Sequence, residues 1–441
     1  MPNWHEFSVL LVSQVALIFA VQNVYLIFYT YGKELEPSDN YFQDAANNPR
    51  RTDFYRFSNV ESFYSAYLEF QTDGQDVEVF WIKHLMSIQL AGVFLGSLIF
   101  GALADYFGRK NVCRAVFFIG TALLAGEGFI HNSIVIAVAR FFVGLLTGGV
   151  IVVTWSFTTE LIQPQTRFLA RAFANWPNAR LILTIICYFT GNWRLTLHIC
   201  AGIAFISFGF YCFFLPESPT WLFCQKRYDE AEKIRELIIQ RSNGACDIKL
   251  PDRKPTKHLT FISIWQKSKY RNIMLLFGTV WILTNFTAAM IDYTEILGVT
   301  EIMFGIINRR NLHLVSLLIS MVGMTIAAVM VTLKLNETYN VAYCFAFLTS
   351  LIFAEFVWDA CYLCVIEQVP TEVRSTVCGT CSFFSRVFGI AATLMVYVKK
   401  EWAPAPLYTA TIAMAIHFLI AFKFLKESKD ADLSEVSLER M

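Results

Sequence analysis

Charged residues are scarce in this chain of 441 residues. They make up 16% of it, whereas soluble domains carry about 25%. Hydrophobic residues make up 56%, and the mean hydropathy is +0.47. This balance excludes a soluble globular fold and a disordered chain, and it predicts a membrane protein with several spans. The formal net charge of +1 gives no sign of nucleic-acid binding.

Motifs for enzyme or cofactor chemistry are also lacking. The sequence contains no glycine-rich phosphate-binding loop followed by a lysine, so we do not expect ATP-driven pumping. We recognise no nucleophile motif and no spaced Cys/His cluster, and therefore predict no enzyme activity, no metal and no other cofactor. Of the eleven cysteines, none lies in 31–80, the longest stretch that could face an oxidising compartment. We predict no disulfide framework and interpret the cysteines of apolar runs as small apolar side chains.

Long apolar runs predict the membrane spans. A helix needs about 20 apolar residues to cross the bilayer core. Eleven runs come near that length: 8–30, 82–104, 113–131, 134–157, 168–190, 195–215, 272–291, 312–333, 341–366, 375–398 and 406–425. The first is long enough to be a retained span rather than a cleaved signal. A twelfth candidate, 294–307, is short and contains Glu295 and Glu301.

The charges of the loops predict the orientation. Segment 217–271 holds 12 basic and 7 acidic residues, whereas 32–80 holds 4 basic and 10 acidic. Basic loops remain in the cytoplasm, so 217–271 is expected inside and 32–80 outside. If 294–307 crosses as a short or distorted eighth helix, Arg374 and the basic tail also fall inside. We therefore expect twelve spans in the lipid bilayer, with both termini cytoplasmic.

A charged signature recurs at a fixed distance. "ELIQPQTR" at 160–167 returns 207 positions later as "EQVPTEVR" at 367–374. A basic turn precedes each copy by about the same interval. The recurrence predicts an all-α protein of two six-helix halves in parallel repeat. We expect four parts: an N-terminal half 1–215 that includes the extracellular loop 32–80, a cytoplasmic helical loop 216–270, a C-terminal half 271–428 and a cytoplasmic tail 429–441.

Several motifs carry a resemblance to a known family. "GALADYFGRK" at 101–110 resembles the signature turn of the major facilitator superfamily. "RFFVGLLTGG" at 140–149, "LPESPTWL" at 215–222 and "SRVFGI" at 385–390 resemble the organic-ion transporters, which carry organic cations, anions and zwitterions. The resemblance spans 55–428. It implies the major facilitator fold, a small organic ion as substrate and a multi-pass position, which we expect to be in the plasma membrane.

The chain departs from the family at several points. Loop 32–80 contains neither cysteine nor an N-x-S/T sequon, although family members carry a longer, cysteine-rich and glycosylated loop. The second basic turn is reduced to "INRRN", and Ala288 and Ala289 replace an aromatic pair typical of the seventh helix. A transport-impaired relative that acts as a receptor or partner protein therefore remains an alternative. Nothing in the sequence indicates the oligomeric state.

The charged turns are candidate gating residues. By the family's pattern they form ion pairs that close the cytoplasmic ends of the helices during alternating access. Surface pairs are worth about 0–1 kcal/mol each, so a cluster of them could close and reopen. The alternative is that the basic members only set the topology. The candidates are Asp105, Arg109, Glu160, Arg167, Glu217, Glu367 and Arg374, with Glu427 as a further one.

Ionisable residues near the centres of spans are the candidate substrate contacts: Arg180, Glu355, Asp359 and Arg386. A charge there costs at least roughly 2.5–3.5 kcal/mol and is functional by default. By resemblance, Arg386 stands where anion and zwitterion carriers have an arginine and cation carriers an acid. Its planar guanidinium matches a carboxylate or sulfate. We therefore predict transport of small organic anions or zwitterions, by uniport or exchange.

Two alternatives stay open for these charges. The two carboxylates could pair permanently with the two arginines, or Glu355 or Asp359 could be the counter-charge of an organic-cation carrier. Aromatic side chains complete the predicted substrate site, because large ring surfaces bind flat or amphiphilic ions. For any one of them ordinary packing is the alternative. They are Trp155, Trp281, Trp358 and Tyr362.

Overall fold

A computed structural model gives the fold of the chain. Every regular element within the described residues is a helix, so the expectation of an all-α protein is confirmed. The described residues are 4–21, 81, 84–130, 132–163, 166–167, 174–190, 193–244, 246, 248, 250, 265, 268–292, 309–336, 338–369, 371–393, 395, 398 and 401–427.

The helices fall into two groups along the chain. The first contains α1 (Trp4–Val21), α7 (Leu85–Phe107), α8 (Arg109–Glu127), α9 (Ser133–Gly149), α10 (Trp155–Leu161), α12 (Trp176–Thr190), α13 (Trp193–Phe213), α14 (Pro219–Cys224) and α15 (Tyr228–Arg241). The second contains α17 (Ser268–Asp292), α18 (Arg309–Thr332), α19 (Asn340–Gln368), α20 (Arg374–Thr393) and α22 (Ala405–Phe424).

Each of the eleven clear apolar runs contains a helix within its described residues. The predicted eighth span, 294–307, lies outside the described residues, as does most of loop 32–80. By length and composition, seven of the described segments could cross a membrane. The run 134–157 contains a feature that we did not predict, a single π-helical turn, η2 (Val150–Thr154), between α9 and α10. Such turns are rare and are often found at functional sites.

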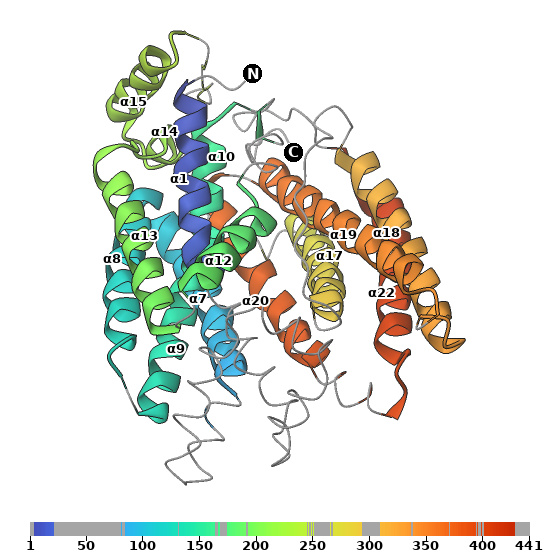
Figure 1. Ribbon diagram of the computed structural model, residues 1–441. Helices are drawn as coiled ribbons and strands as arrows, with labels where there is room; N and C mark the ends of the chain where they lie inside the picture. Colours follow the sequence, from blue (N-terminus) through green and yellow to red (C-terminus); the bar gives the residue numbers. More distant parts are fainter. Residues whose placement is uncertain are drawn as a thin grey trace.

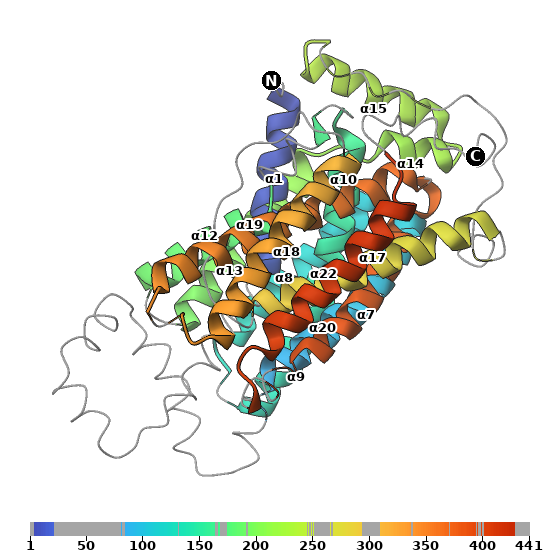
Figure 2. The ribbon, with the colours of Figure 1, turned by 90° about the vertical axis from the view of Figure 1, so that its right-hand side faces the viewer.

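Figure 1 shows how the two groups are arranged. Helices α1, α8, α9 and α13 lie together on one side, and α17, α18, α19 and α22 lie on the other. Helices α7 and α20 pack against each other between them. Two helices with no long apolar run, α14 and α15, lie at the end of the molecule where α1 begins, as Figures 1 and 2 both show. We call this the α14 end.

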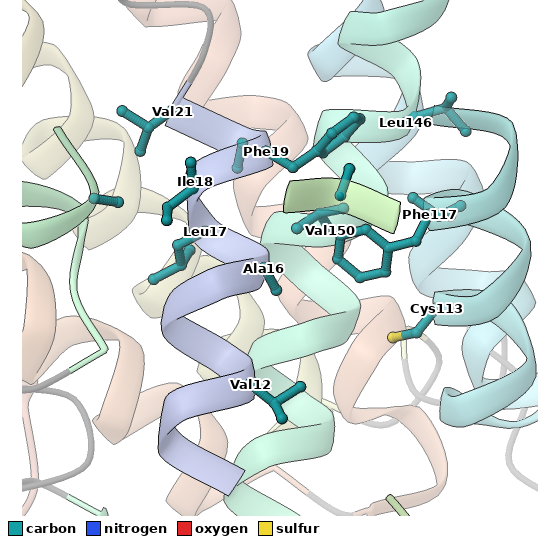
Figure 3. Packing of buried hydrophobic residues seen from close by; sticks show 14 of the residues in the cluster. Val12, Ala16, Leu17, Ile18, Phe19, Val21, Cys113, Phe117, Leu146 and Val150 are labelled. Atoms are coloured by element: carbon teal, nitrogen blue, oxygen red, sulfur yellow. The ribbon is translucent and has the colours of Figure 1, made fainter. Parts of the chain in front are cut away.

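Close packing holds the helices of the first group together. Figure 3 shows Phe19 of α1 and Phe117 of α8 within one buried apolar cluster. Their ring centroids are 5.9 Å apart, and a Cβ at Gly120 would come within 2.7 Å of the Phe19 ring. In the second group, Ser320 of α18 donates to the carbonyl of Ser350 on α19 over 2.8 Å. Such hydrogen bonds link helices where lipid offers no polar partner.

The start of α14 follows from its sequence. Ser218 precedes the helix, and its Oγ accepts a hydrogen bond from the Trp221 backbone N–H over 3.2 Å. Pro219 then occupies the first helical position, where its missing N–H is not needed. This cap fixes the start of α14, next to Glu217 and Trp221, which contact the turn between α7 and α8.

Candidate functional site

Four charged side chains meet at the α14 end, and we call them the Glu160 network: Asp105, Arg109, Glu160 and Arg374. Arg109 Nη2 lies 3.0 Å from Asp105 Oδ1, and Arg109 Nε lies 3.4 Å from Glu160 Oε2. From the other group of helices, Arg374 Nη1 lies 2.9 Å from Glu160 Oε1. The network therefore joins α7, α8 and α10 to α20.

The Glu160 network is buried. The side chains of Arg109, Glu160 and Arg374 are 0% exposed and that of Asp105 is 9% exposed. Our expectation of weak surface pairs is therefore wrong for this cluster, because the packed helix ends exclude water from it. Removing one partner of a buried pair typically costs about 3–5 kcal/mol, since the other charge loses its compensation. The network can thus join the two groups of helices more firmly than surface pairs could.

Further hydrogen bonds reach the network, most of them from backbone groups. Arg109 Nη2 donates to the Thr371 carbonyl over 2.8 Å, and Arg374 Nη2 donates to the Val369 carbonyl over 3.1 Å. Asp105 Oδ2 accepts from the backbone N–H of Thr376 at 2.8 Å and from its Oγ1 at 2.6 Å. Thr376 lies in the first turn of α20, where backbone N–H groups lack helical partners and favour an anion.

The arginines of the two copies of the repeated signature make the same backbone contact. Arg167 Nε donates to the Thr159 carbonyl over 3.3 Å, and Arg374 Nε donates to the Ile366 carbonyl over 3.1 Å. Each arginine therefore binds the backbone eight positions before it, at the end of the preceding helix. Glu367, the counterpart of Glu160, is also buried, at 1% exposure.

Glu217 lies beside the network and caps α8. Its Oε1 accepts from the backbone N–H groups of Lys110 at 3.1 Å and Ser218 at 3.0 Å. Burial raises the pKa of Glu217, while these two donors oppose the rise. Trp221 Nε1 donates to the Asp105 carbonyl over 2.9 Å. The remaining candidate, Glu427, contacts a different helix. Its Oε2 accepts a hydrogen bond from the Arg310 backbone N–H, at the start of α18, over 3.1 Å.

Small residues let α7 and α20 touch beside the network. A Cβ at Gly101 would lie 2.6 Å from the Ser375 carbonyl oxygen, and one at Gly379 would overlap the carbonyl oxygen of Ser97. Neither helix could approach this closely with larger residues at these positions. Close backbone contact between α7 and α20 therefore accompanies the ion pairs at the α14 end.

Three of the predicted aromatic residues form a cluster deeper in the molecule. The ring centroid of Trp281 lies 4.2 Å from that of Tyr362 and 5.6 Å from that of Trp358. Trp281 is fully buried, and its Nε1 has no hydrogen-bond partner in the structure. Trp155 of α10 belongs to the same buried apolar cluster as Trp281 and Tyr362. The structure thus brings together aromatic residues from both groups of helices.

Arg386 lies close to the crossing of α17 and α20. Asn285 Nδ2 on α17 donates over 2.8 Å to the carbonyl of Ser385, the residue before Arg386. Asn285 is one helical turn beyond Trp281, so the arginine position and the aromatic cluster border the same helix contact. Arg386 is half-buried. It stands twelve residues, or about 18 Å, along α20 from Arg374.

The predicted carboxylates occupy α19 at a comparable depth. Glu355 is half-buried and lies 13 residues before the end of α19. Asp359 follows one turn later and is 4% exposed. Arg180 is half-buried on α12, in the first group of helices. Charges of both signs and aromatic rings therefore occupy the middle of the second group.

A second buried ion pair was missed by our sequence analysis. Arg140 of α9 donates from Nε to Glu127 Oε1 at the end of α8, and both residues are 1% exposed. Arg140 Nη1 also lies 3.5 Å from Gln89 Oε1 on α7. Glu127 ends the helix that Arg109 begins, so this pair stands at the opposite end of α8 from the network. The sequence feature that could have revealed this pair is Arg140, a charged residue in the apolar run "RFFVGLLTGG".

Comparisons with known proteins agree on the class of protein. A family model described as "Sugar (and other) transporter" matches residues 19–439. An uncharacterized protein of Caenorhabditis elegans is 26% identical, with 95% of this chain and 91% of that protein covered. The organic cation transporter-like protein of Drosophila melanogaster is 27% identical; the match covers 73% of this chain but 63% of that protein, less than two thirds of its length.

A solved structure confirms the predicted fold. The proton:xylose symporter XylE of the major facilitator superfamily, bound to 6-bromo-6-deoxy-D-glucose, superposes with a TM-score of 0.71 at 13% identity. The match covers 98% of each chain.

Proposed function

Because the chain belongs to the sugar (and other) transporter family, we propose that it moves small organic anions or zwitterions across a membrane by alternating access. The family and the fold are those of membrane transporters rather than enzymes. Transport is by uniport or exchange, driven by the gradient of the substrate or of a counter-ion. The observation that carries the preference for negative charge is the position of Arg386 at the α17–α20 crossing.

The surroundings of Arg386 support this preference. A guanidinium stays charged at every physiological pH and offers a planar fork of donors that matches a carboxylate. The rings of Trp281, Trp358 and Tyr362 lie near the same crossing and offer flat surfaces to the apolar part of a ligand. Glu355 and Asp359 suit the cationic group of a zwitterion. One site can therefore recognise a negative group, an apolar body and a second charge.

The Glu160 network gives the proposed cycle its gate. With Arg374 bound to Glu160 and Thr376 bound to Asp105, the α14 end is shut. Opening this end must separate those contacts and the α7–α20 backbone contact together. The basic charge of loop 217–271 favours a cytoplasmic position for the α14 end, and on this ground we propose cytoplasmic termini. The resemblance to organic-ion transporters supports the proposal of a plasma-membrane location.

An organic-cation carrier is the second candidate. Asp359 is buried and stands three positions before Tyr362, on the same face of α19; the Tyr362 ring contacts Trp358 with ring centroids 5.2 Å apart. A carboxylate beside aromatic faces attracts a cation. One relative is itself named an organic cation transporter-like protein.

Uptake into proteoliposomes that contain the purified full chain separates the candidates. We expect saturable uptake of p-aminohippurate, little uptake of tetraethylammonium, and loss of the anion uptake in Arg386→Asp. Arg235→Asp, at a partly exposed position of α15, is the control. Tetraethylammonium uptake that disappears in Asp359→Asn would establish the cation carrier instead. Absence of saturable uptake for a broad panel of ions would contradict transport and favour a receptor or partner protein.

A further inference from the structure

Two phenylalanine rings join the two groups of helices between the Glu160 network and Arg386. Phe94 of α7 and Phe383 of α20 stack with their ring centroids 3.8 Å apart and an angle of 22° between the ring planes. We call these two rings the Phe94 stack. Neither residue was among the predicted site residues, because an isolated phenylalanine in an apolar run gives no signal of its partner.

The stack continues the close contact between α7 and α20. On α20 the contacts with α7 fall at Ser375, Gly379 and Phe383, each four positions after the one before. Residues four apart lie on one face of a helix. Arg386 comes three positions after Phe383, which places it on the same side of α20, about 4.5 Å further along the axis. The stack is therefore the last contact of this series before Arg386.

The stack lies on the inner side of α7. Phe94 stands with Ser97 on the side that meets α20. Leu95 and Ile99, on the other side of the helix, are 38% and 44% exposed. Both rings of the stack are only half-buried, although they lie where the two groups of helices meet. Each therefore keeps part of its surface available for a further contact.

Arg386 and the stack together suit an anion that carries an aromatic ring. The guanidinium offers two parallel donors to a carboxylate. Aromatic rings favour other rings as neighbours, in offset or edge-to-face arrangements that aliphatic groups cannot reproduce. The separation of about 4.5 Å along α20 between Phe383 and Arg386 matches a ligand whose ring and carboxylate are a few bonds apart.

We propose that the Phe94 stack is the floor of the substrate site, its boundary towards the α14 end, and that it gives the site a preference for anions with a flat aromatic ring. Arg386 binds the carboxylate, and the ring of the anion packs against Phe94 and Phe383. Phe94 contributes this contact from the first group of helices. The inference rests on the proposed transport of organic anions, and it adds the aromatic part of the substrate and two residues that recognise it.

Two anions that differ only in the ring test the proposal. Hippurate carries a benzene ring, and hexahydrohippurate carries a cyclohexane ring at the same place, with the same amide and carboxylate. Isothermal titration calorimetry measures the Kd of each for the purified full chain, as wild type, Phe94→Leu and Phe383→Leu. Phe388→Leu is the matched control, because Phe388 is 46% exposed and stands two positions after Arg386, on the opposite side of α20.

We expect wild type and the control to bind hippurate about 3- to 10-fold more tightly than hexahydrohippurate, as one aromatic contact implies. The two leucine variants should bind both anions equally well, whereas Phe94→Tyr and Phe383→Tyr keep a ring and should keep the preference. Thermal unfolding verifies that each variant is folded, and methionine replaces leucine where the leucine variant does not fold.

The same preference in the leucine variants as in wild type would overturn the proposal. Loss of the preference in only one of them would overturn the stack as a joint surface. If wild type binds both anions without preference, this inference fails and the proposed anion transport stands. If wild type binds neither anion, the proposed anion transport fails and this inference fails with it.

Discussion

Arg374 of α20 donates a hydrogen bond from Nη1 to Oε1 of Glu160 over 2.9 Å. These residues are not equivalent members of the repeat: the counterpart of Glu160 is Glu367, and that of Arg374 is Arg167. The acid of the first signature therefore binds the arginine of the second. A doubled motif at this position can connect the two groups of helices, because the acid of the first copy binds the arginine of the second.

Glu160→Gln should weaken the closed α14 end, because Arg109 and Arg374 would remain buried with one negative charge fewer between them. We expect a loss of about 3 kcal/mol in the free energy of unfolding, seen as a lower thermal unfolding midpoint, and slower transport. Glu230→Gln is the control, because its pair with Arg227 is about half exposed and such pairs contribute at most about 1 kcal/mol. Equal midpoints for the two variants would contradict the role given to Glu160.

Thr376→Val removes one of the two hydrogen bonds that Asp105 accepts from this residue and keeps the shape of the side chain. A hydrogen bond to a charged group contributes about 1.5–3 kcal/mol, so the variant should open at the α14 end more readily. Labelling of Cys378 by a membrane-permeant maleimide measures this opening. We expect faster labelling in Thr376→Val and wild-type labelling in Thr376→Ser. A labelling rate that is the same in all three proteins would argue against the contact as part of the gate.

Gly379→Ala should separate α7 from α20, because the new Cβ would overlap the Ser97 carbonyl oxygen. We expect a lower unfolding midpoint and impaired closure at the α14 end. Gly278→Ala on α17 is the matched control, since nothing lies within 4 Å of the Cβ position there. Alanine gains up to about 1 kcal/mol over glycine inside a helix, so the control should be neutral or stabilising. A neutral Gly379→Ala would show that the helices do not need this contact.

The buried pair of Arg140 and Glu127 should behave as a structural unit. Either single substitution, Arg140→Met or Glu127→Leu, leaves one buried charge without compensation and should cost about 3–5 kcal/mol. The double variant removes both charges and should recover much of that loss. Thermal unfolding of the three variants measures the recovery. If the double variant loses the sum of the two single losses, the residues do not act as a pair.

The sequence predicted the helices well because hydropathy is a local property. Within the described residues, each of the eleven clear runs contains a helix, since a span must satisfy every backbone polar group within itself. The π-helical turn at Val150–Thr154 was not predictable in this way, because nothing in "VIVVT" distinguishes it from a regular helix. It arises where Gly148 and Gly149 pack closely on α7.

The candidate site was predicted in its residues but not in its contacts. The recurrent signature pointed to Glu160 and Arg374, yet their cross-pairing depends on how the two groups of helices pack. Thr376 carried no signal, because the acid that it binds is 271 positions away. The roles of Arg386, Glu355 and Asp359 at the site remain predictions.

Binding of a labelled organic anion to the purified chain tests the central claim most directly. We predict saturable binding of p-aminohippurate that weakens about 10- to 100-fold in Arg386→Gln, as the loss of a charged hydrogen-bonding partner implies, and that is unchanged in Arg235→Gln. Binding of the anion with equal affinity by wild type and Arg386→Gln would contradict the account.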